Sequence, residues 1–178
     1  MWPVTASRIA YENRWIKVVE DQVVGPDGAP GVYGVVELLN PAVFVVAVNE
    51  RDEVLFETID RHTVGPSLEV PAGGSDGDDL LAAAQRELHE ETGYVAERWR
   101  PIGFMNALNG ICRAPEHVFL AEGLSREADG ADAGAEGISG VRWIPWAEVL
   151  RMVASGEITD GETVASLMHA AIALGRLS

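Results

Sequence analysis

The chain has 178 residues, of which 47% are apolar and 23% charged, a composition that fits one globular domain with a buried core. Its formal net charge of -15 at pH 7 repels nucleic-acid backbones and anionic membrane surfaces, so neither is an expected partner. Cys112 is the only cysteine, which makes an intramolecular disulfide impossible and argues against a thiolate metal site.

The first residues, MWPVTASRIAYENRW, lack the basic and apolar regions of a secretory signal. No apolar run approaches the roughly 20 residues of a membrane helix, so we expect a cytoplasmic protein. The segment from Asn13 to Leu39 predicts two strands around the turn-forming sequence GPDGAPG. We interpret residues 1–39 as a small N-terminal β-element and residues 40–178 as the main domain.

The main domain begins with a continuous β-branched run at residues 42–48, typical of a strand buried on both faces. NERDE turns the chain, and residues 54–59 form the expected return strand. A loop follows, with a short extended piece at residues 68–70.

Residues 78–92 give the clearest helix prediction. Asp78 or Asp76 is the expected N-cap, and Gly93 supplies a C-terminal stop. Apolar residues recur at helical spacing on one face, which predicts that this face packs on the core. They are Leu80, Leu81, Ala84 and Leu88.

The rest of the chain predicts strands at residues 99–105, 117–121 and 141–144, and then two closing helices. Residues 125–140 are a polar, glycine-bearing loop, and loops of that length are usually functional or disordered. The whole pattern indicates an α/β (α+β) fold in which helices pack on a sheet.

Three carboxylates gather on the predicted helix, because residues three and four apart share a face. Glu87, Glu90 and Glu91 lie within roughly 100° of arc around the helix axis. Such a group suits a hard divalent cation such as Mg²⁺ or Mn²⁺. The competing interpretation is a solvated acidic face with no ligand.

The sequence around these carboxylates resembles the signature of the Nudix hydrolases, G-x5-E-x7-R-E-U-x-E-E-x-G-U, where U is bulky and apolar. RELHEETG, residues 86–93, agrees at every fixed position. Asp78 stands in place of the first Glu, the loop before it is one residue short, and Tyr94 fills the last apolar position. LEVPAGG, HVFLAEGL and GEITDGETVASL extend the resemblance to the ADP-ribose pyrophosphatase branch. It implies a Nudix-type mixed sheet sandwiched by helices.

The resemblance also implies a metal site that holds Mg²⁺, with Mn²⁺ as the alternative ion. Glu87 and Glu91 would be the principal ligands, Glu90 would share a second ion, and the carbonyl of Ala72 would complete the shell. Arg86 would orient the glutamates.

The resemblance also implies residues for substrate binding and for general-base catalysis. Glu69, in LEVPAG, would contact the substrate or water at the metal. The general base is expected on the loop at residues 125–140, where Glu136 matches best and Glu127 second, the alternative being a solvated loop acid. Together with Glu136, Glu90 and Arg86 complete the expected catalytic set.

Arg61 and Trp15 can each be interpreted in two ways. Arg61 ends the sequence IDR where the branch usually carries Q-x-R, so it either binds phosphate or is a surface arginine. Trp15 either stacks on a base at a dimer groove or packs in the core.

The implied reaction is metal-dependent attack by water on a nucleoside diphosphate linked to another moiety, with ADP-ribose or a nucleotide sugar such as GDP-mannose as the leading substrates. The alternatives are a non-catalytic Nudix-like nucleotide sensor or regulator, and an acidic interaction module. The N-terminal β-element is expected to act as the arm of a homodimer, because a two-stranded element is marginal alone.

Overall fold

The computed structural model describes residues 1–127 and 137–177. The chain divides into two compact units, each with its own internal contacts. Unit 1 comprises Met1–Pro41 and Met105–Glu116, and unit 2 comprises Ala42–Phe104 and His117–Ser178. The segment at 105–116 therefore belongs with the N-terminal residues, while the boundary at residue 39 stays a prediction.

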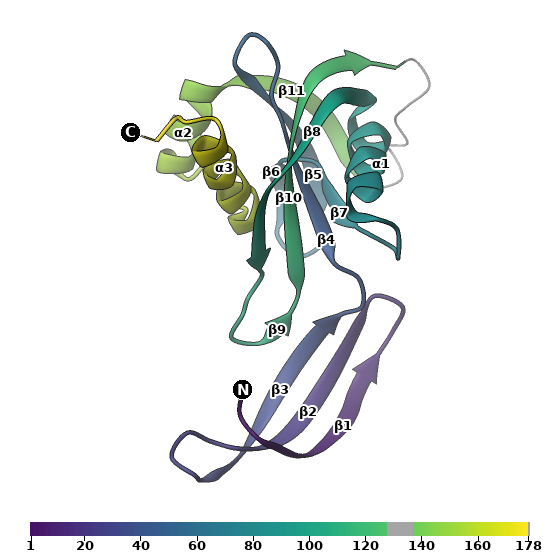
Figure 1. Cartoon of the computed structure of the whole chain (residues 1–178), viewed down its shortest axis with the longest axis vertical. Coiled ribbons are helices and arrows are strands. Elements are labelled where there is room, and N and C mark those ends of the chain that lie inside the picture. The colour runs from purple at the N-terminus through teal and green to yellow at the C-terminus, as the bar shows by residue number, and fades with distance from the viewer. Residues whose placement is uncertain (128–136, 178) are drawn as a thin grey trace. The chain divides into compact units, whose positions relative to one another are not determined.

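Unit 1 is built on one sheet with the strand order β1-β2-β3-β9 (Figure 1). Its strands are β1 (Val4–Glu12), β2 (Ile16–Val24), β3 (Pro30–Leu38) and β9 (Cys112–Arg113). The two strands predicted around GPDGAPG are confirmed as β2 and β3, which pair antiparallel. The sequence interpretation missed β1, because VTASRIAYE mixes small, polar and apolar residues and every one of them is exposed.

Unit 2 contains two sheets, with strand orders β7-β4-β10-β8 and β11-β5-β6. The strands are β4 (Ala42–Ala47), β5 (Glu53–Arg61), β6 (Gly65–Glu69), β7 (Ala72–Gly74), β8 (Tyr94–Asn106), β10 (Pro115–Arg126) and β11 (Ile138–Pro145). All the strands predicted for the main domain are present, although β8 and β10 extend well beyond the predicted ranges.

In the part of the chain that the structure describes, three helices cover these sheets: α1 (Leu80–Thr92), α2 (Trp146–Ser155) and α3 (Gly161–Ala173). In unit 2, α1 lies on one side of the strands, and α2 and α3 lie on the other (Figure 1). The predicted mixed fold, with a sheet between helices, is confirmed. None of the helices within residues 1–127 and 137–177 is both long and apolar enough to cross a membrane.

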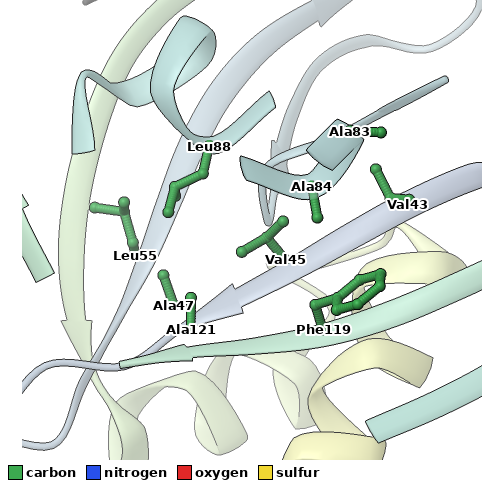
Figure 2. Close-up of a cluster of buried hydrophobic side chains, with 9 residues drawn as sticks. All are labelled: Val43, Val45, Ala47, Leu55, Ala83, Ala84, Leu88, Phe119 and Ala121. Carbon is green, nitrogen blue, oxygen red and sulfur yellow. The ribbon is translucent and has the colours of Figure 1, made fainter. Parts of the chain in front are cut away.

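The core beneath α1 explains why this helix is held firmly. Ala83, Ala84 and Leu88 contact strands β4, β5 and β10 in one apolar cluster (Figure 2). Its other members are Val43, Val45, Ala47, Leu55, Phe119 and Ala121. The alternate residues of β4, Phe44 and Val46, are buried as well, so β4 is buried on both faces as predicted.

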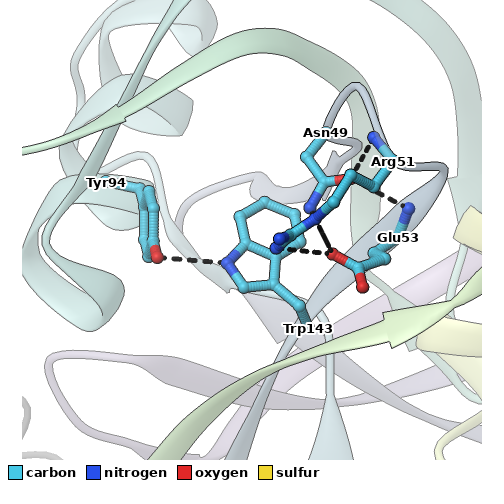
Figure 3. Close-up of polar contacts among 5 residues, drawn as sticks. All are labelled: Asn49, Arg51, Glu53, Tyr94 and Trp143. Atoms are coloured by element: carbon cyan, nitrogen blue, oxygen red, sulfur yellow. Dashed lines mark hydrogen bonds and ion pairs between the residues drawn. The ribbon is translucent and has the colours of Figure 1, made fainter.

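The C-terminal end of α1 is tied to β11 by an aromatic pair. The Tyr94 and Trp143 rings meet edge to face with centroids 5.3 Å apart, and Trp143 Nε1 donates to Tyr94 Oη at 3.1 Å (Figure 3). Tyr94 thus fills the last apolar position of the signature with a bulky ring and adds a hydrogen bond to Trp143.

In the turn between β4 and β5, Asn49 Nδ2 donates to Glu53 Oε2 at 2.7 Å.

Candidate active site

The inner face of α1 is half apolar and half acidic. Beside Ala84 and Leu88, the side chains of Glu87 and Glu91 are buried, with 4% and 2% of each residue exposed. The helix is fixed at both ends, by Asp79 at the N-cap and by left-handed Gly93 at the C-cap. The predicted cap, Asp78 or Asp76, is wrong, because Asp79 Oδ1 is the atom that accepts from the N–H groups of the first turn.

The backbone of β7 runs directly against the two buried carboxylates. The Ala72 N–H donates to Glu91 Oε2 at 2.9 Å. A Cβ added at Gly73 would lie 2.3 Å from Glu87 Cδ, a distance that no real Cβ tolerates. The glycine therefore leaves the space that the Glu87 carboxylate occupies.

Arg86 connects several acidic groups at the edge of this site. Its guanidinium lies 2.8 Å from Glu87 Oε1 and 3.1 Å from Glu90 Oε2, and donates to the Gly74 carbonyl at 2.8 Å. Asp78, at the divergent motif position, lies 3.9 Å from Arg86 Nε. Burial opposes the charge of Arg86, but the charge of Glu87 and the hydrogen bond to Glu90 outweigh it and raise the pKa of Arg86.

A second arginine serves the carboxylates of β5 and β6. Arg61 makes two hydrogen bonds to the buried Glu69, at 3.2 Å and 2.6 Å. The bond to Glu69 is the main reason why the pKa of Arg61 is raised, and the charges of Glu57 and Glu91 add to it. Arg61, whose side chain is 41% exposed, is thus held by the buried carboxylate of Glu69, and the phosphate-binding role predicted for it stays a prediction.

The first turn of α3 closes this region. Thr163 Oγ1 accepts a hydrogen bond from the Val70 N–H at 3.2 Å, which joins GETVASL to LEVPAG. Burial raises the pKa of the Glu162 carboxyl, and the charges of Asp160 and Glu69 raise it further. These contacts explain why two motifs almost 100 residues apart in the sequence belong to one site.

Sequence reasoning missed Glu57, whose residue is fully buried on β5. The available signal was a single acidic residue inside the apolar sequence VLFETI. Read alone, such a residue fits an ordinary half-buried strand. Only the pairing of β5 with β6 places it opposite Glu69.

The remaining predicted residues lie in different surroundings. Glu90 is at the rim, with its side chain 47% exposed. Glu127 lies 3.6 Å from His89 Nε2. His89 follows Glu87 by two residues, about 200° around the helix, so Glu127 contacts the face of α1 opposite the buried glutamates.

Trp15 belongs to unit 1 and is 61% exposed, so it does not pack in the core of the chain. The Arg14 guanidinium lies over its ring, 4.0 Å from the centroid. Glu136 lies outside the described residues. The roles predicted for these residues stay predictions.

The donor set fits a divalent cation. Glu57, Glu69, Glu87 and Glu91 are buried, and Arg61 and Arg86 make ion pairs with Glu69 and Glu87. Carboxylate oxygens are the ligands that Mg²⁺ and Mn²⁺ prefer.

The candidate metal ligands do not surround a single cation position in the described part of the chain. Within residues 1–127 and 137–177, no three His, Cys, Asp or Glu side chains form a group with metal-binding geometry. In this arrangement Glu69 is paired with Arg61 and Glu87 with Arg86.

The loop that is one residue short retains a regular closure. Asp76 and Gly77 both have left-handed backbones, with φ of 51° and 89°. The Asp78 N–H donates to the Ser75 carbonyl at 2.8 Å, which closes the turn. The shortened loop thus still delivers the chain from β7 to the start of α1.

Comparison with known proteins gives two family matches. Residues 38–167 match the profile described as NUDIX domain. Residues 2–36 match the profile described as nucleoside diphosphate sugar hydrolase N-terminal domain. The two matches together span most of the chain.

Individual relatives carry related activities. A CMP-5'-(N-acetyl-N-hydroxy-3-aminopropyl)phosphonate hydrolase of Streptomyces rubellomurinus is 28% identical, over 98% of this chain and 84% of the relative. An ADP-ribose pyrophosphatase of Bacillus subtilis is 29% identical, over 72% of this chain and 70% of the relative. A GDP-mannose pyrophosphatase of Klebsiella pneumoniae is 34% identical, over 59% of this chain and 54% of the relative.

The fold is shared with a solved structure. The crystal structure of an ADP compounds hydrolase superposes with a TM-score of 0.85, covering 98% of this chain and 94% of that chain. The sequence identity is 19%, so this likeness concerns the fold alone.

Replacing Gly73 by Ala should displace the Glu87 carboxylate, because the new methyl group would overlap it. We expect Mn²⁺ affinity to fall by about tenfold or more while the far-ultraviolet circular dichroism spectrum is unchanged. Gly140→Ala is the control, since nothing lies within 4 Å of its Cβ position. Equal Mn²⁺ affinity in Gly73→Ala and wild type would contradict the placement of Glu87.

Proposed function

The chain belongs to the NUDIX family, and on that premise we propose that it is a divalent-metal-dependent hydrolase of a nucleoside diphosphate joined to a second group. One observation carries the proposal: Glu87 and Glu91 are buried side by side on α1, against the backbone of β7. Burying two carboxylates is costly unless positive charge balances them, and a bound divalent metal would supply such charge.

The residues of the chain divide the work as follows. Glu87 and Glu91 would hold the metal with the Ala72 carbonyl, and Glu90 would assist at a second ion. A bound Mg²⁺ or Mn²⁺ supplies charge neutralisation at the phosphate oxygens and a lowered pKa for the attacking water. Arg86 keeps Glu87 and Glu90 in place through its ion pairs.

Arg61 and Glu69 would meet the diphosphate. The Arg61 guanidinium is planar and bidentate toward Glu69, and the same geometry suits two phosphate oxygens. Glu69, once released from Arg61, would face the substrate or the water. In the reaction, water adds to phosphorus, the bond from phosphorus to the bridging oxygen breaks, and a base takes the proton of the water.

The substrate class is narrowed by the names of the relatives. CMP, ADP and GDP each appear there joined to a further group, so the bases differ while a nucleotide is common. We propose ADP-ribose or a nucleotide sugar such as GDP-mannose as the substrate. Cys112 is the only cysteine, and this suits a reducing compartment, so we propose a cytoplasmic location.

A hydrolysis screen tests the function directly. ADP-ribose, nucleotide sugars and CMP-linked phosphonates would each be incubated with the protein and Mg²⁺ or Mn²⁺, and the released monophosphate measured. Turnover of at least one compound supports the proposal. Metal-dependent binding without turnover would favour the alternative of a nucleotide sensor.

Glu91→Gln should remove at least about nine-tenths of the rate at saturating Mg²⁺ and leave the fold intact. The change keeps the shape of the side chain but removes a charge, and losing metal-based charge stabilisation usually costs several kcal/mol. Rates measured beside Glu97→Gln, at an exposed position of β8, provide the control. A Glu91→Gln protein with near wild-type rate would refute the assignment.

Glu136 remains the proposed general base, tested against Glu127. Glu136→Gln should lower the maximal rate by about 10²–10⁴-fold without changing Mg²⁺ affinity, because a base acts on the water. Glu127→Gln should stay near wild type, since Glu127 faces His89 on the far side of α1. If Glu127→Gln carries the loss, the base assignment is wrong. If neither substitution lowers the rate, Glu90 and Glu69 are the next candidates for the general base.

We also propose a homodimer formed through unit 1. Strand β1 is the edge of its sheet and is exposed along its whole length. Ile9 and Tyr11, which are 55% and 54% exposed, put large apolar surface on that edge. Exposed, apolar edge strands tend to pair with another chain, so a second copy would cover β1.

Light scattering at micromolar concentration should therefore give twice the 19.1 kDa of one chain. Ile9→Lys should shift the mass toward the monomer, because it places charge on the paired edge. Leu150→Lys, at a 51% exposed position of α2, should leave the mass unchanged. A monomeric wild-type protein would rule out the dimer.

A further inference from the structure

We propose that Glu57 is a further residue of this site, a positioning residue whose charge supports divalent-cation binding from outside the signature. The inference rests on the proposed function, because it concerns the same cation. Glu57 lies on β5, 30 residues before Glu87 on α1, and no part of the signature includes it.

The first argument is the register of β5 and β6. Glu57 and Glu69 are directly opposite each other in this antiparallel pair, and both are buried, with 0% and 5% of the residue exposed. Opposed side chains of this kind have Cβ atoms about 4.5–5.5 Å apart, and like charges there are destabilising. Stability of the strand pair alone therefore does not explain why two carboxyl groups are placed opposite each other.

The second argument is the position of Arg61. Arg61 is four residues further along β5, so it is on the same face as Glu57. Its guanidinium makes two hydrogen bonds to the carboxylate of Glu69, which faces Glu57 across the strand pair. Glu57 therefore lies beside the two residues proposed to meet the diphosphate, and its charge raises the pKa of Arg61, as the charges of Glu69 and Glu91 do.

The third argument is electrostatic. Glu57 places a second buried carboxyl opposite Glu69, on the face of β5 where Arg61 lies. A negative charge at that position makes the surroundings of Glu69 more favourable for a cation.

A purely structural role makes a different prediction. If Glu57 only braces Arg61, its shape and hydrogen bonds matter, and Gln is the closest replacement in shape. If its charge supports the cation, Asp is the better replacement, because it keeps the charge although it is shorter. The pair Glu57→Gln and Glu57→Asp therefore separates the two roles.

The experiment measures Mn²⁺ affinity by electron paramagnetic resonance on the full chain, and the thermal unfolding midpoint in EDTA. For Glu57→Gln we expect Mn²⁺ affinity about 10- to 100-fold weaker than wild type. Its midpoint in EDTA should not be lower, because the change removes one of two like charges that face each other across β5 and β6. Glu57→Asp should bind Mn²⁺ more tightly than Glu57→Gln does.

Glu53→Gln is the matched control. It carries the same substitution on the same strand, about 13 Å away by strand geometry, where Glu53 contacts Asn49 and Arg51. Its Mn²⁺ affinity should equal that of wild type.

Two results overturn the inference: wild-type Mn²⁺ affinity in Glu57→Gln, or weaker binding by Glu57→Asp than by Glu57→Gln. If Glu57→Gln does not fold, Glu57→Asp decides, since a charge role requires it to bind Mn²⁺ within about tenfold of wild type. Failure of the proposed function has another signature, because the wild-type protein would then bind no Mn²⁺ at all.

Discussion

Buried negative charge is the constraint on which the rest of unit 2 depends. Glu57, Glu69, Glu87 and Glu91 are nearly or fully removed from water, and Arg61 and Arg86 make ion pairs with Glu69 and Glu87. Carboxylates in such a place tend to move apart or take up protons. The firm apolar packing of α1 on β4 and β10 resists the first response, because the helix cannot shift without opening the core (Figure 2).

Much of this could be predicted from sequence, for identifiable reasons. Helical spacing alone brings Glu87 and Glu91 to one face, and the fixed residues of RELHEETG identify the family. Glu57 could not be found in this way, because its partner Glu69 is set by strand register, which depends on contacts distant in sequence. The N-cap at Asp79 was missed because Asp76, Asp78 and Asp79 all have the right chemistry, and only backbone geometry selects among them.

Strand β1 shows a different limit. A strand that buries nothing in its own chain has no apolar pattern to reveal it, so VTASRIAYE could not be recognised. The N-terminal profile match spans residues 2–36 and so includes this strand. Trp15 follows the same logic, since large aromatic residues are normally assigned to a core, and here one lies at the surface. Features that lie outside the core of a chain are the ones that periodicity describes least well.

The tight turn before α1 bears on how relatives of this chain are found. Asp76 and Gly77 take up left-handed conformations and bring the chain to the helix with one residue fewer than the signature counts. A search that requires the exact residue spacing of the signature would reject this sequence, although Glu87 and Glu91 still contact β7. Homologues with other loop lengths are then better sought by the buried carboxylates and the glycine facing them than by the number of residues between.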